Sequence, residues 1–548
     1  MWRALRRIVL IPTLIGLTVL ALIATVVFGL AWNGSQKVLA AQQAQNPIVY
    51  GLTLQPTTFD PYVGSSSELG IALRSVYDTL VYRDPTSRQF VPGLASKTEV
   101  SSDGLTYTFT LRQDVTFHDG TAFDAHAVAA MLDRVTNPKT NSQKAVFLLG
   151  PFDHYTIVDP YTIQLVLKQP FAPLLDGLAQ VYLGIASPKA LAAYDTDLYQ
   201  FHQVGTGPFM LTDYVPGDHL TLRRNPAYHW GPAFYHLPTS HAVDQITFRF
   251  YLDPATRAPA LESGEAQVMG ELSPTDALLF AGSTTLKLYP QAVPGMPLQF
   301  LFNTAQPPTD QLAVRQALIQ ATNRTAIVDA VFQQFSPVAY GPLNAVTPEY
   351  DTRMQTFYPF DSVKALQALS SLGYSVPQGQ KVLSKGGQPL HLVMIVPPWG
   401  FHPEVAQQIQ SQWRELGIDV ELRQVANYGG LLAAQKAGDY NLLAVNDFGV
   451  DSSLLNRFYS SAASPAWTHY KSADLDAALS QGAQTLDPAQ RLILYGNAQQ
   501  QIMKQALLLP IRDYVNLNGA SAQIGQLSYD AYGWFPLLAN LTYEPSAN

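Results

Sequence analysis

The segment from Asp103 to Arg134 limits most strongly what this chain can fold into. Asp103-Gly104 is a turn dipeptide, and apolar and polar residues then alternate from Leu105 to Arg112. This alternation predicts a half-buried strand, because successive side chains of a strand point to opposite faces. A second turn follows at Asp119-Gly120, and the apolar spacing after Asp124 predicts a helix capped by that aspartate. The segment therefore predicts a strand, a turn and a capped helix.

The same two patterns alternate along the rest of the chain, which predicts α/β units rather than a solenoid or a barrel. With 548 residues, the chain is too long for a single hydrophobic core and predicts two to four structural units. Strands are predicted at 246–251, 391–396, 418–422 and 440–445, and helical patterns at 254–264, 314–332 and 404–416.

Composition excludes several classes of protein. Hydrophobic residues make up 47% and aromatic residues 11% of the chain, which excludes a disordered protein. The net charge is -8, and no basic run with interleaved aromatic residues occurs, so a nucleic-acid partner is not expected. The chain has no cysteine, which excludes disulfides, thiolate metal sites, cysteine nucleophiles and a lipidated N-terminal cysteine.

The N-terminal residues 1–40 indicate an exported protein. Arg3, Arg6 and Arg7 precede a stretch from Ile8 to Gln36 that contains no charged residue. Arginines before an apolar run keep the N-terminus in the cytoplasm and direct the following chain outward. The run is long enough for a transmembrane anchor, whereas the small residues at 38–40 also fit a signal-peptide cleavage site. Both interpretations remain, with the anchor favoured, and residues 41–47 read as a linker.

Catalytic motifs do not occur in the sequence. It lacks G-x-S-x-G, a phosphate-binding loop, H-E-x-x-H and a complete G-x-G-x-x-G. His118, Asp119, Asp124 and His126 could suggest a metal cluster, but a turn followed by a helix cap accounts for the same residues. No cofactor and no metal are therefore expected, and the chain is not expected to be an enzyme.

The motifs of the chain, taken in order, resemble those of the family 5 extracellular solute-binding proteins, which serve ATP-driven importers of oligopeptides, dipeptides and nickel chelates. The resemblance runs from about Ile48 to about Ala531, and its strongest part is the segment from Asp103 onward. The further motifs are TFDP (58–61), VYDTL (76–80), PGLA (92–95), GTGPF (205–209), RNPAY (224–228), FNT (302–304), VRQAL (314–318), LGY (372–374), GIDV (417–420) and LPI (509–511).

The resemblance implies a two-lobed α/β fold of the type II periplasmic-binding-protein class, with a hinge and an extra subdomain inserted in lobe I. Lobe II would comprise residues 298–508, and the inserted subdomain residues 81–204. Lobe I would be assembled from residues 48–80, 205–297 and 509–545. A hinge of few crossing segments would let the lobes close on a ligand without unfolding.

The implied function is that of an extracytoplasmic receptor that closes around a solute, for which a peptide is favoured. It would deliver the solute to the permease subunits of an ABC importer. Two alternatives remain at this point. One is a peptide-binding sensor or chaperone that is not coupled to transport, and the other is an exported hydrolase on the same scaffold.

The resemblance also implies a ligand site in the loop after the predicted strand 440–445. Phe448, Gly449 and Asp451 match the family's aromatic-Gly-x-Asp, in which the aspartate pairs with a peptide ammonium and the aromatic ring packs on the first side chain. A carboxylate buried by lobe closure would bind an ammonium strongly. The alternative is that Asp451 only caps the turn that begins at Ser452.

Departures from the family pattern weaken the assignment to short peptides. Asp451 is followed by Ser-Ser-Leu, and residues 397–400 read Pro-Pro-Trp-Gly where dipeptide-binding members tend to have an arginine. A longer, sugar-like or apolar ligand therefore stays open. Trp399, and less strongly Trp467, could stack on such a ligand or belong to the core. Ser65 and Ser66 could face the ligand or simply cap the next helix.

Overall fold

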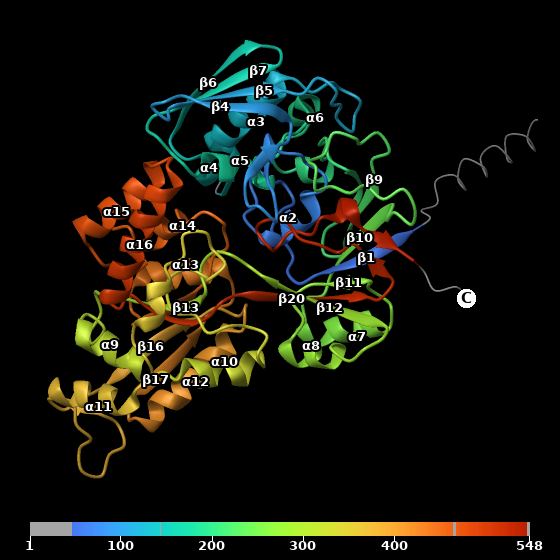
Figure 1. Cartoon of the computed structure of the whole chain (residues 1–548). Coiled ribbons are helices and arrows are strands. Elements are labelled where there is room, and N and C mark those ends of the chain that lie inside the picture. The colour runs from blue at the N-terminus through green and yellow to red at the C-terminus, as the bar shows by residue number, and fades with distance from the viewer. Residues whose placement is uncertain (1–45, 143, 464–466, 545–548) are drawn as a thin grey trace, which may run out of the picture. The chain divides into compact units, whose positions relative to one another are not determined.

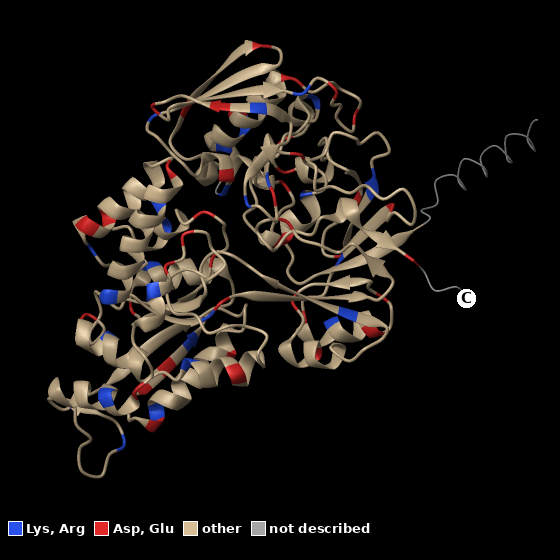
Figure 2. Cartoon of the chain, viewed as in Figure 1, with Lys and Arg blue, Asp and Glu red and all other residues tan. Residues whose placement is uncertain are grey.

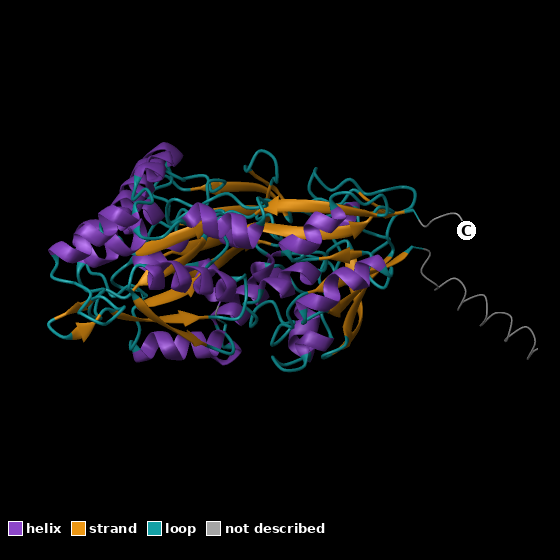
Figure 3. Cartoon of the chain, turned by 90° about the horizontal axis from the view of Figure 1, so that it is seen from below, coloured by secondary structure: helices purple, strands orange, loops and turns teal. Residues whose placement is uncertain are grey.

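The computed structural model describes residues 46–142, 144–463 and 467–544, which form a mixed α/β fold of several sheets and many helices. Figure 1 shows the order of the elements along the chain, and Figure 3 shows strands and helices intermixed throughout the fold. Over these ranges, no helix is long and apolar enough to cross a membrane. The predicted anchor or signal peptide lies outside the described residues, as does most of the predicted linker.

The largest sheet combines segments that are far apart in the sequence. Its strand order is β12-β20-β11-β1-β10-β9-β8. β1 pairs with β11 in parallel, whereas β12–β20, β20–β11, β10–β9 and β9–β8 are antiparallel pairs. The predicted strand 246–251 is confirmed as β10. The strands are β1 (Pro47–Leu52), β8 (Phe209–Val215), β9 (His219–Arg224), β10 (Gln245–Phe250), β11 (Val268–Met269), β12 (Leu286–Ala292) and β20 (Val515–Ser521).

A second sheet of five strands has the order β17-β16-β18-β13-β19. The strands predicted at 391–396, 418–422 and 440–445 are confirmed as β16, β17 and β18. The buried apolar runs form β16 and β18, which lie inside the sheet. The strands are β13 (Leu298–Phe302), β16 (His391–Val396), β17 (Asp419–Gln424), β18 (Leu442–Val445) and β19 (Leu508–Arg512). Short ladders elsewhere are formed by β2 (Val81–Arg83) with β3 (Phe90–Pro92), β14 (Ser384–Lys385) with β15 (Gln388–Pro389), and β21 (Ile524–Gly525) with β22 (Thr542–Tyr543).

The strand predicted after the Asp103-Gly104 turn lies in a four-stranded sheet of order β4-β5-β7-β6. Its strand buries Tyr107, Phe109 and Leu111, as the alternation predicted. Asp124 caps the following helix by accepting a hydrogen bond from the backbone N–H of His126. The elements are β4 (Ala95–Val100), β5 (Thr106–Leu111), β6 (Phe152–Asp159), β7 (Thr162–Leu167) and α3 (Ala125–Thr136).

One predicted helix is two helices in the structure. The pattern at 314–332 is interrupted at residues 321–323, where the side chain of Asn323 accepts from the N–H of Ala326 and starts a new helix. The helices, with α3 already given, are α2 (Ser67–Leu73), α4 (Lys144–Leu149), α5 (Leu174–Leu178), α6 (Pro188–Ala193), α7 (Arg257–Glu262), α8 (Pro274–Phe280), α9 (Leu312–Gln320), α10 (Arg324–Phe332), α11 (Ser362–Ser371), α12 (His402–Glu415), α13 (Tyr428–Ala437), α14 (Leu454–Tyr459), α15 (Ala473–Gln484) and α16 (Pro488–Lys504).

The division into lobes stays a prediction, but the sheets show where the chain changes from one layer to another. It passes from the seven-stranded to the five-stranded sheet between β12 and β13, and returns between β19 and β20. β19 belongs to the five-stranded sheet, so the chain leaves this sheet after Arg512.

The turn FHDG (117–120) makes hydrogen bonds to distant parts of the fold. The Nε2 atom of His118 lies 2.9 Å from the carbonyl oxygen of Gly207, and the backbone N–H of Gly205 donates to its Nδ1 at 3.3 Å. Asp119 accepts hydrogen bonds from Thr121 and Ser187. The turn therefore ties the strand–helix segment to the GTGPF motif.

The GTGPF motif needs its glycines because it lies directly on the VYDTL segment. A Cβ atom added at Gly205 would overlap the carbonyl oxygen of Val76. We expect Gly205→Ala to lower the free energy of unfolding by about 1–3 kcal/mol, the usual cost of forcing extra volume into a packed site. Chemical denaturation checks this. Gly282→Ala is the control, since a Cβ there meets nothing within 4 Å, and an equal loss in both variants would contradict the packing explanation.

Candidate functional site

The predicted ligand loop follows β18, and its aspartate is already paired within the chain. Both carboxylate oxygens of Asp451 lie 2.8 Å from Nη2 of Arg491, which comes from α16. One of these oxygens also accepts the backbone N–H of Ser453 at 2.9 Å. Burial would raise the pKa of Asp451, but the charge and hydrogen bonds of Arg491 outweigh it and hold the pKa below its ordinary value.

Arg491 is held on other sides as well. Its Nε donates to the carbonyl oxygen of Gly482 at 3.0 Å, and its Nη1 lies 3.5 Å from Glu349. Glu349 accepts the hydroxyl of Ser452 at 2.8 Å. Burial raises the pKa of Glu349, and the nearby charge of Asp451 raises it further. The loop after β18 is therefore fixed by a buried network of charges.

A second ion pair, from the predicted inserted subdomain, lies close enough to interact electrostatically with this network. Arg83, at the end of β2, contacts Asp176 of α5 at 2.5 Å. Burial raises the pKa of Asp176, and the charge of Asp451 adds to the increase. The two parts also touch directly, because the N–H of Ala172 donates to the carbonyl oxygen of Ala483 at 2.8 Å. Residues from two distant parts of the chain thus meet at Ala483, next to the Gly482 carbonyl that binds Arg491.

The aromatic residue of the loop packs against the C-terminal part of the chain. The ring of Phe448 stacks on Trp534 at a centroid distance of 4.8 Å and meets Tyr514 edge-on at 4.7 Å. The N–H of Gly449 donates to the carbonyl oxygen of Pro294 at 3.1 Å. Phe448 and Gly449 are half-buried, so the loop remains partly open to solvent.

The two tryptophans predicted to stack on a ligand differ in exposure. Trp399 is half-buried, and its ring centroid lies 6.5 Å from that of Tyr428. Trp467 is only 1% exposed and packs against Phe458 at 5.1 Å, which is the setting of a core residue. Trp399 therefore keeps part of its surface exposed to solvent, and the ligand-binding roles of both tryptophans stay predictions.

The serines before α2 also separate into two roles. Ser66 caps the helix by accepting from the N–H of Glu68, and its carbonyl oxygen accepts the hydroxyl of Tyr182 at 2.8 Å. Ser65 is exposed.

The ring of Tyr182 lies 4.1 Å from the ammonium of Lys144. Burial lowers the pKa of Lys144 to about 8, and the charge of Asp447 opposes that shift.

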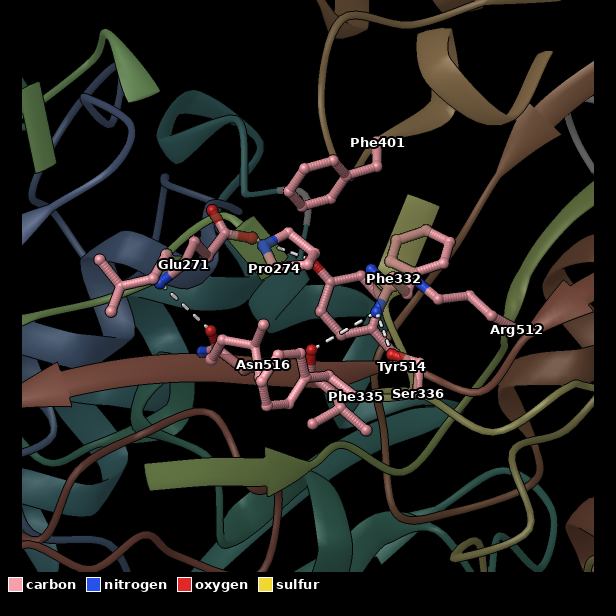
Figure 4. Close-up of a pocket in the computed structure, with 12 residues that line it drawn as sticks. Glu271, Pro274, Phe332, Phe335, Ser336, Phe401, Arg512, Tyr514 and Asn516 are labelled. Carbon is pink, nitrogen blue, oxygen red and sulfur yellow. Dashed lines mark hydrogen bonds between the residues drawn. The ribbon is translucent and has the colours of Figure 1, made fainter. Parts of the chain in front are cut away.

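A pocket lies beside this loop, where the chain returns from β19 to β20 (Figure 4). It is a small, partly open pocket, with a cavity volume of about 10 Å³. The guanidinium of Arg512 lies between the rings of Phe332 and Tyr514, 4.0 and 4.2 Å from their centroids. None of the predicted site residues lines it, and Tyr514 connects it to Phe448. Its lining residues are Glu271, Leu272, Pro274, Phe332, Phe335, Ser336, Phe401, Arg512, Tyr514, Val515, Asn516 and Leu517.

The loop after β18 combines paired charges with aromatic rings. Among the described residues, no group of three or more His, Cys, Asp or Glu side chains could hold a metal ion. Acidic and basic positions are interspersed over the ribbon (Figure 2). What the loop offers is buried, mutually paired charges beside aromatic rings, an arrangement that can orient polar and apolar parts of a small molecule.

Arg491, Glu349, Arg83 and Asp176 were not predicted as site residues. Each comes from a segment far from the loop, and each is an ordinary charged residue in its own sequence context. Arg491 follows the helix-start pattern Asp487-Pro488, which predicts a helix but gives no sign of a partner 40 positions earlier. Only the folded chain brings these charges together.

Comparison with known proteins identifies the family. The model of "Bacterial extracellular solute-binding proteins, family 5 Middle" matches residues 89–468. The glutathione-binding protein GsiB of Salmonella paratyphi A is 31% identical over 489 residues, which cover 85% of this chain and 89% of that protein. GsiB of Escherichia coli O157:H7 is 30% identical over the same shares of the two chains.

Solved structures agree in fold. NikA from Brucella suis, in complex with Fe(III)-EDTA, superposes with a TM-score of 0.81 at 24% identity, over 91% of this chain and all of that chain. The dipeptide-binding protein from Pseudoalteromonas sp. SM9913, in complex with Met-Leu, superposes with a TM-score of 0.78 at 21% identity and the same coverage. The fold is therefore that of the type II periplasmic binding proteins. The chain belongs to family 5 of the bacterial extracellular solute-binding proteins, which are receptors of ABC importers rather than enzymes.

Proposed function

We propose that this chain binds a peptide or a peptide-like solute outside the cytoplasm and delivers it to the permease of an ABC importer. Its similarity to a glutathione-binding protein and to a dipeptide-binding protein supports the peptide-like class. The observation that carries the proposal is the partly open loop at Phe448 and Gly449, which lies beside the buried Asp451–Arg491 pair. The predicted inserted subdomain reaches the same region, since the N–H of Ala172 donates to the carbonyl oxygen of Ala483.

We infer that the solute lies against this loop, in contact with Phe448, Gly449 and Trp399. The half-buried state of all three supports this placement, since a fully buried ring has no face to offer. Exposed Ser65 and the helix cap Ser66 are the proposed contacts on the opposite side. Asp451 shapes the loop through its charge and hydrogen bonds. Trp467 would contribute only through the packing beneath the loop.

Closure is the proposed means of capture. Among the described strands, the chain passes between the two large sheets only between β12 and β13 and between β19 and β20. Few connections allow two bodies to rotate without disturbing either core. A solute that binds both bodies favours the closed arrangement, because its affinity differs between the open and closed states.

The identity of the solute is the first experimental question. We expect the purified protein to release a small molecule on unfolding, detected by mass spectrometry of the filtered supernatant. Returning that molecule to the stripped protein should raise the melting temperature in a concentration-dependent way, because it binds only the folded state. Stripped protein whose melting temperature responds neither to the released fraction nor to a peptide library would contradict the proposal.

We further propose that the apolar N-terminal segment holds the receptor at the outer face of the membrane. The three arginines before the segment and the absence of cysteine in the chain support an uncleaved anchor. N-terminal sequencing of the membrane fraction should then begin at or near Met1. Recovery of only soluble protein beginning near Ala41 would identify the segment as a signal peptide.

A further inference from the structure

The carboxylate of Asp451 is already engaged by partners within the chain. Both oxygens contact Nη2 of Arg491 at 2.8 Å, and one of them also accepts the N–H of Ser453. The side chains of Asp451 and Arg491 are 8% and 11% exposed, so water replaces little of this pairing. The position that a ligand ammonium would take against both oxygens is therefore occupied by Arg491.

Arg491 is also not free to move aside. It is part of α16, a helix of 17 residues. Its Nε donates to the carbonyl oxygen of Gly482, and its Nη1 lies beside Glu349. Displacing it would break the contact with Asp451 and disturb these other two. It would also leave a buried guanidinium without its partner, which is strongly unfavourable in a site with little water.

The charge of Arg491 disfavours an incoming cation as well. An ammonium placed against Asp451 would meet the guanidinium of Arg491, whose Nη2 already lies 2.8 Å from both carboxylate oxygens. Like charges brought together in a site of low dielectric repel each other, and such repulsion is a common source of specificity against the wrong ligand.

We propose that Arg491 is a resident counter-ion that takes the place of a ligand ammonium at Asp451, so that the chain selects solutes lacking a free amine at this point. This inference rests on the proposed function of the loop as a ligand site. It names the solute class as peptide-like molecules with a blocked or neutral group at the end next to Asp451. In this account Arg491 is a specificity-determining residue that acts by excluding amines.

The test removes the Arg491 side chain and measures whether a ligand amine then binds at Asp451. The probes are tri-alanine and N-acetyl-tri-alanine, and the readout is the concentration that gives half the maximal rise in melting temperature. In Arg491→Ala we expect tri-alanine to act at a concentration at least tenfold lower than in the wild-type protein. N-acetyl-tri-alanine should show no such gain, because it carries no ammonium for Asp451.

Two further variants separate this inference from a purely structural role. Arg457→Ala is the matched control, because Arg457 pairs with Asp447 of the same loop at 3.1 Å yet is more exposed; it should show no gain. Adding Asp451→Asn to Arg491→Ala should abolish the gain, since the charge that receives the ammonium is then absent. If Arg491→Ala does not fold, Arg491→Gln replaces it, because its side chain preserves more of the packing.

Equal responses to tri-alanine in wild type and in the folded Arg491 variant would overturn the inference. So would a wild-type protein that binds tri-alanine and rejects its N-acetyl form. Either result would leave the proposed receptor function intact, because that function is tested separately by the solute released from the wild-type protein. A released solute with a free amine that is essential for wild-type binding would also contradict the role of Arg491.

Discussion

Replacing Asp78 by leucine is expected to destabilise the protein by about 4 kcal/mol or more. The carboxylate is 2% exposed and has no arginine or lysine partner among the described residues. It accepts from the hydroxyls of Tyr82, Tyr228 and Thr206 and from the indole N–H of Trp230. Leucine is of similar size but offers no acceptor, and each buried donor left without one costs about 1–3 kcal/mol.

The same position offers a graded comparison. Asp78→Asn should cost much less, because the tyrosine hydroxyls can turn to accept from the new amide while its oxygen still accepts from Trp230. Exposed Asp197→Leu is the control for the loss of an acidic residue. Urea unfolding of the three variants measures the difference. Equal midpoints for Asp78→Leu and Asp197→Leu would show that the network at Asp78 contributes nothing.

Stability is expected to fall as pH rises from 5 to 8, in contrast to proteins whose acids are stabilised as anions. Burial raises the pKa of Glu68 to about 8, and the charge of Glu271 adds to that shift. Burial likewise raises the pKa of Asp513 and of Asp530 to about 7. The hydroxyl of Thr53 lies 3.1 Å from the carboxyl of Glu68 and 2.7 Å from that of Glu271, so it connects the two acids.

The direction of the change of stability with pH follows from proton binding. Between the unfolded pKa of about 4 and the folded values, the native state holds more protons than the unfolded chain. The stabilisation is complete below pH 4 for these three groups and is lost as pH rises through 7 and 8. One unit of pKa difference corresponds to about 1.4 kcal/mol, so a loss on the order of 3 kcal/mol or more is expected between pH 5 and pH 8.

Calorimetry at pH 5, 6, 7 and 8 checks this dependence. Glu68→Gln imitates the neutral acid and should give a flatter profile, with its largest gain over wild type at pH 8. Exposed Asp197→Asn is the control and should follow the wild-type profile. A wild-type melting temperature that rises from pH 5 to pH 8 would contradict the raised pKa values.

Local patterns in the sequence predicted local structure well. The strand β5, the helix α3 and its cap at Asp124 follow from alternation and spacing within 30 residues. The helix pattern at 314–332 failed at one point, because the cap at Asn323 resets the helix without changing the apolar spacing. Secondary structure that depends on neighbouring residues can therefore be predicted from the sequence.

Contacts between remote residues could not be predicted in this way. The motif VYDTL was recognised, yet the role of Asp78 depends on donors more than 100 positions away, at Thr206, Tyr228 and Trp230. Likewise, Asp451 was identified by resemblance as a candidate for binding an ammonium. Its partner Arg491 becomes apparent only when α16 packs beside the loop. The candidate loop could be named from the sequence, but the arginine that pairs with its aspartate could not.

The central claim is that this receptor closes around its solute, and small-angle X-ray scattering tests it most directly. The radius of gyration should be measured for stripped protein and for the same protein saturated with the solute that it releases on unfolding. Closure about the connections between the two large sheets predicts a smaller radius in the saturated sample. An unchanged radius, with binding confirmed by calorimetry on the same samples, would contradict closure and the mode of capture proposed for this chain.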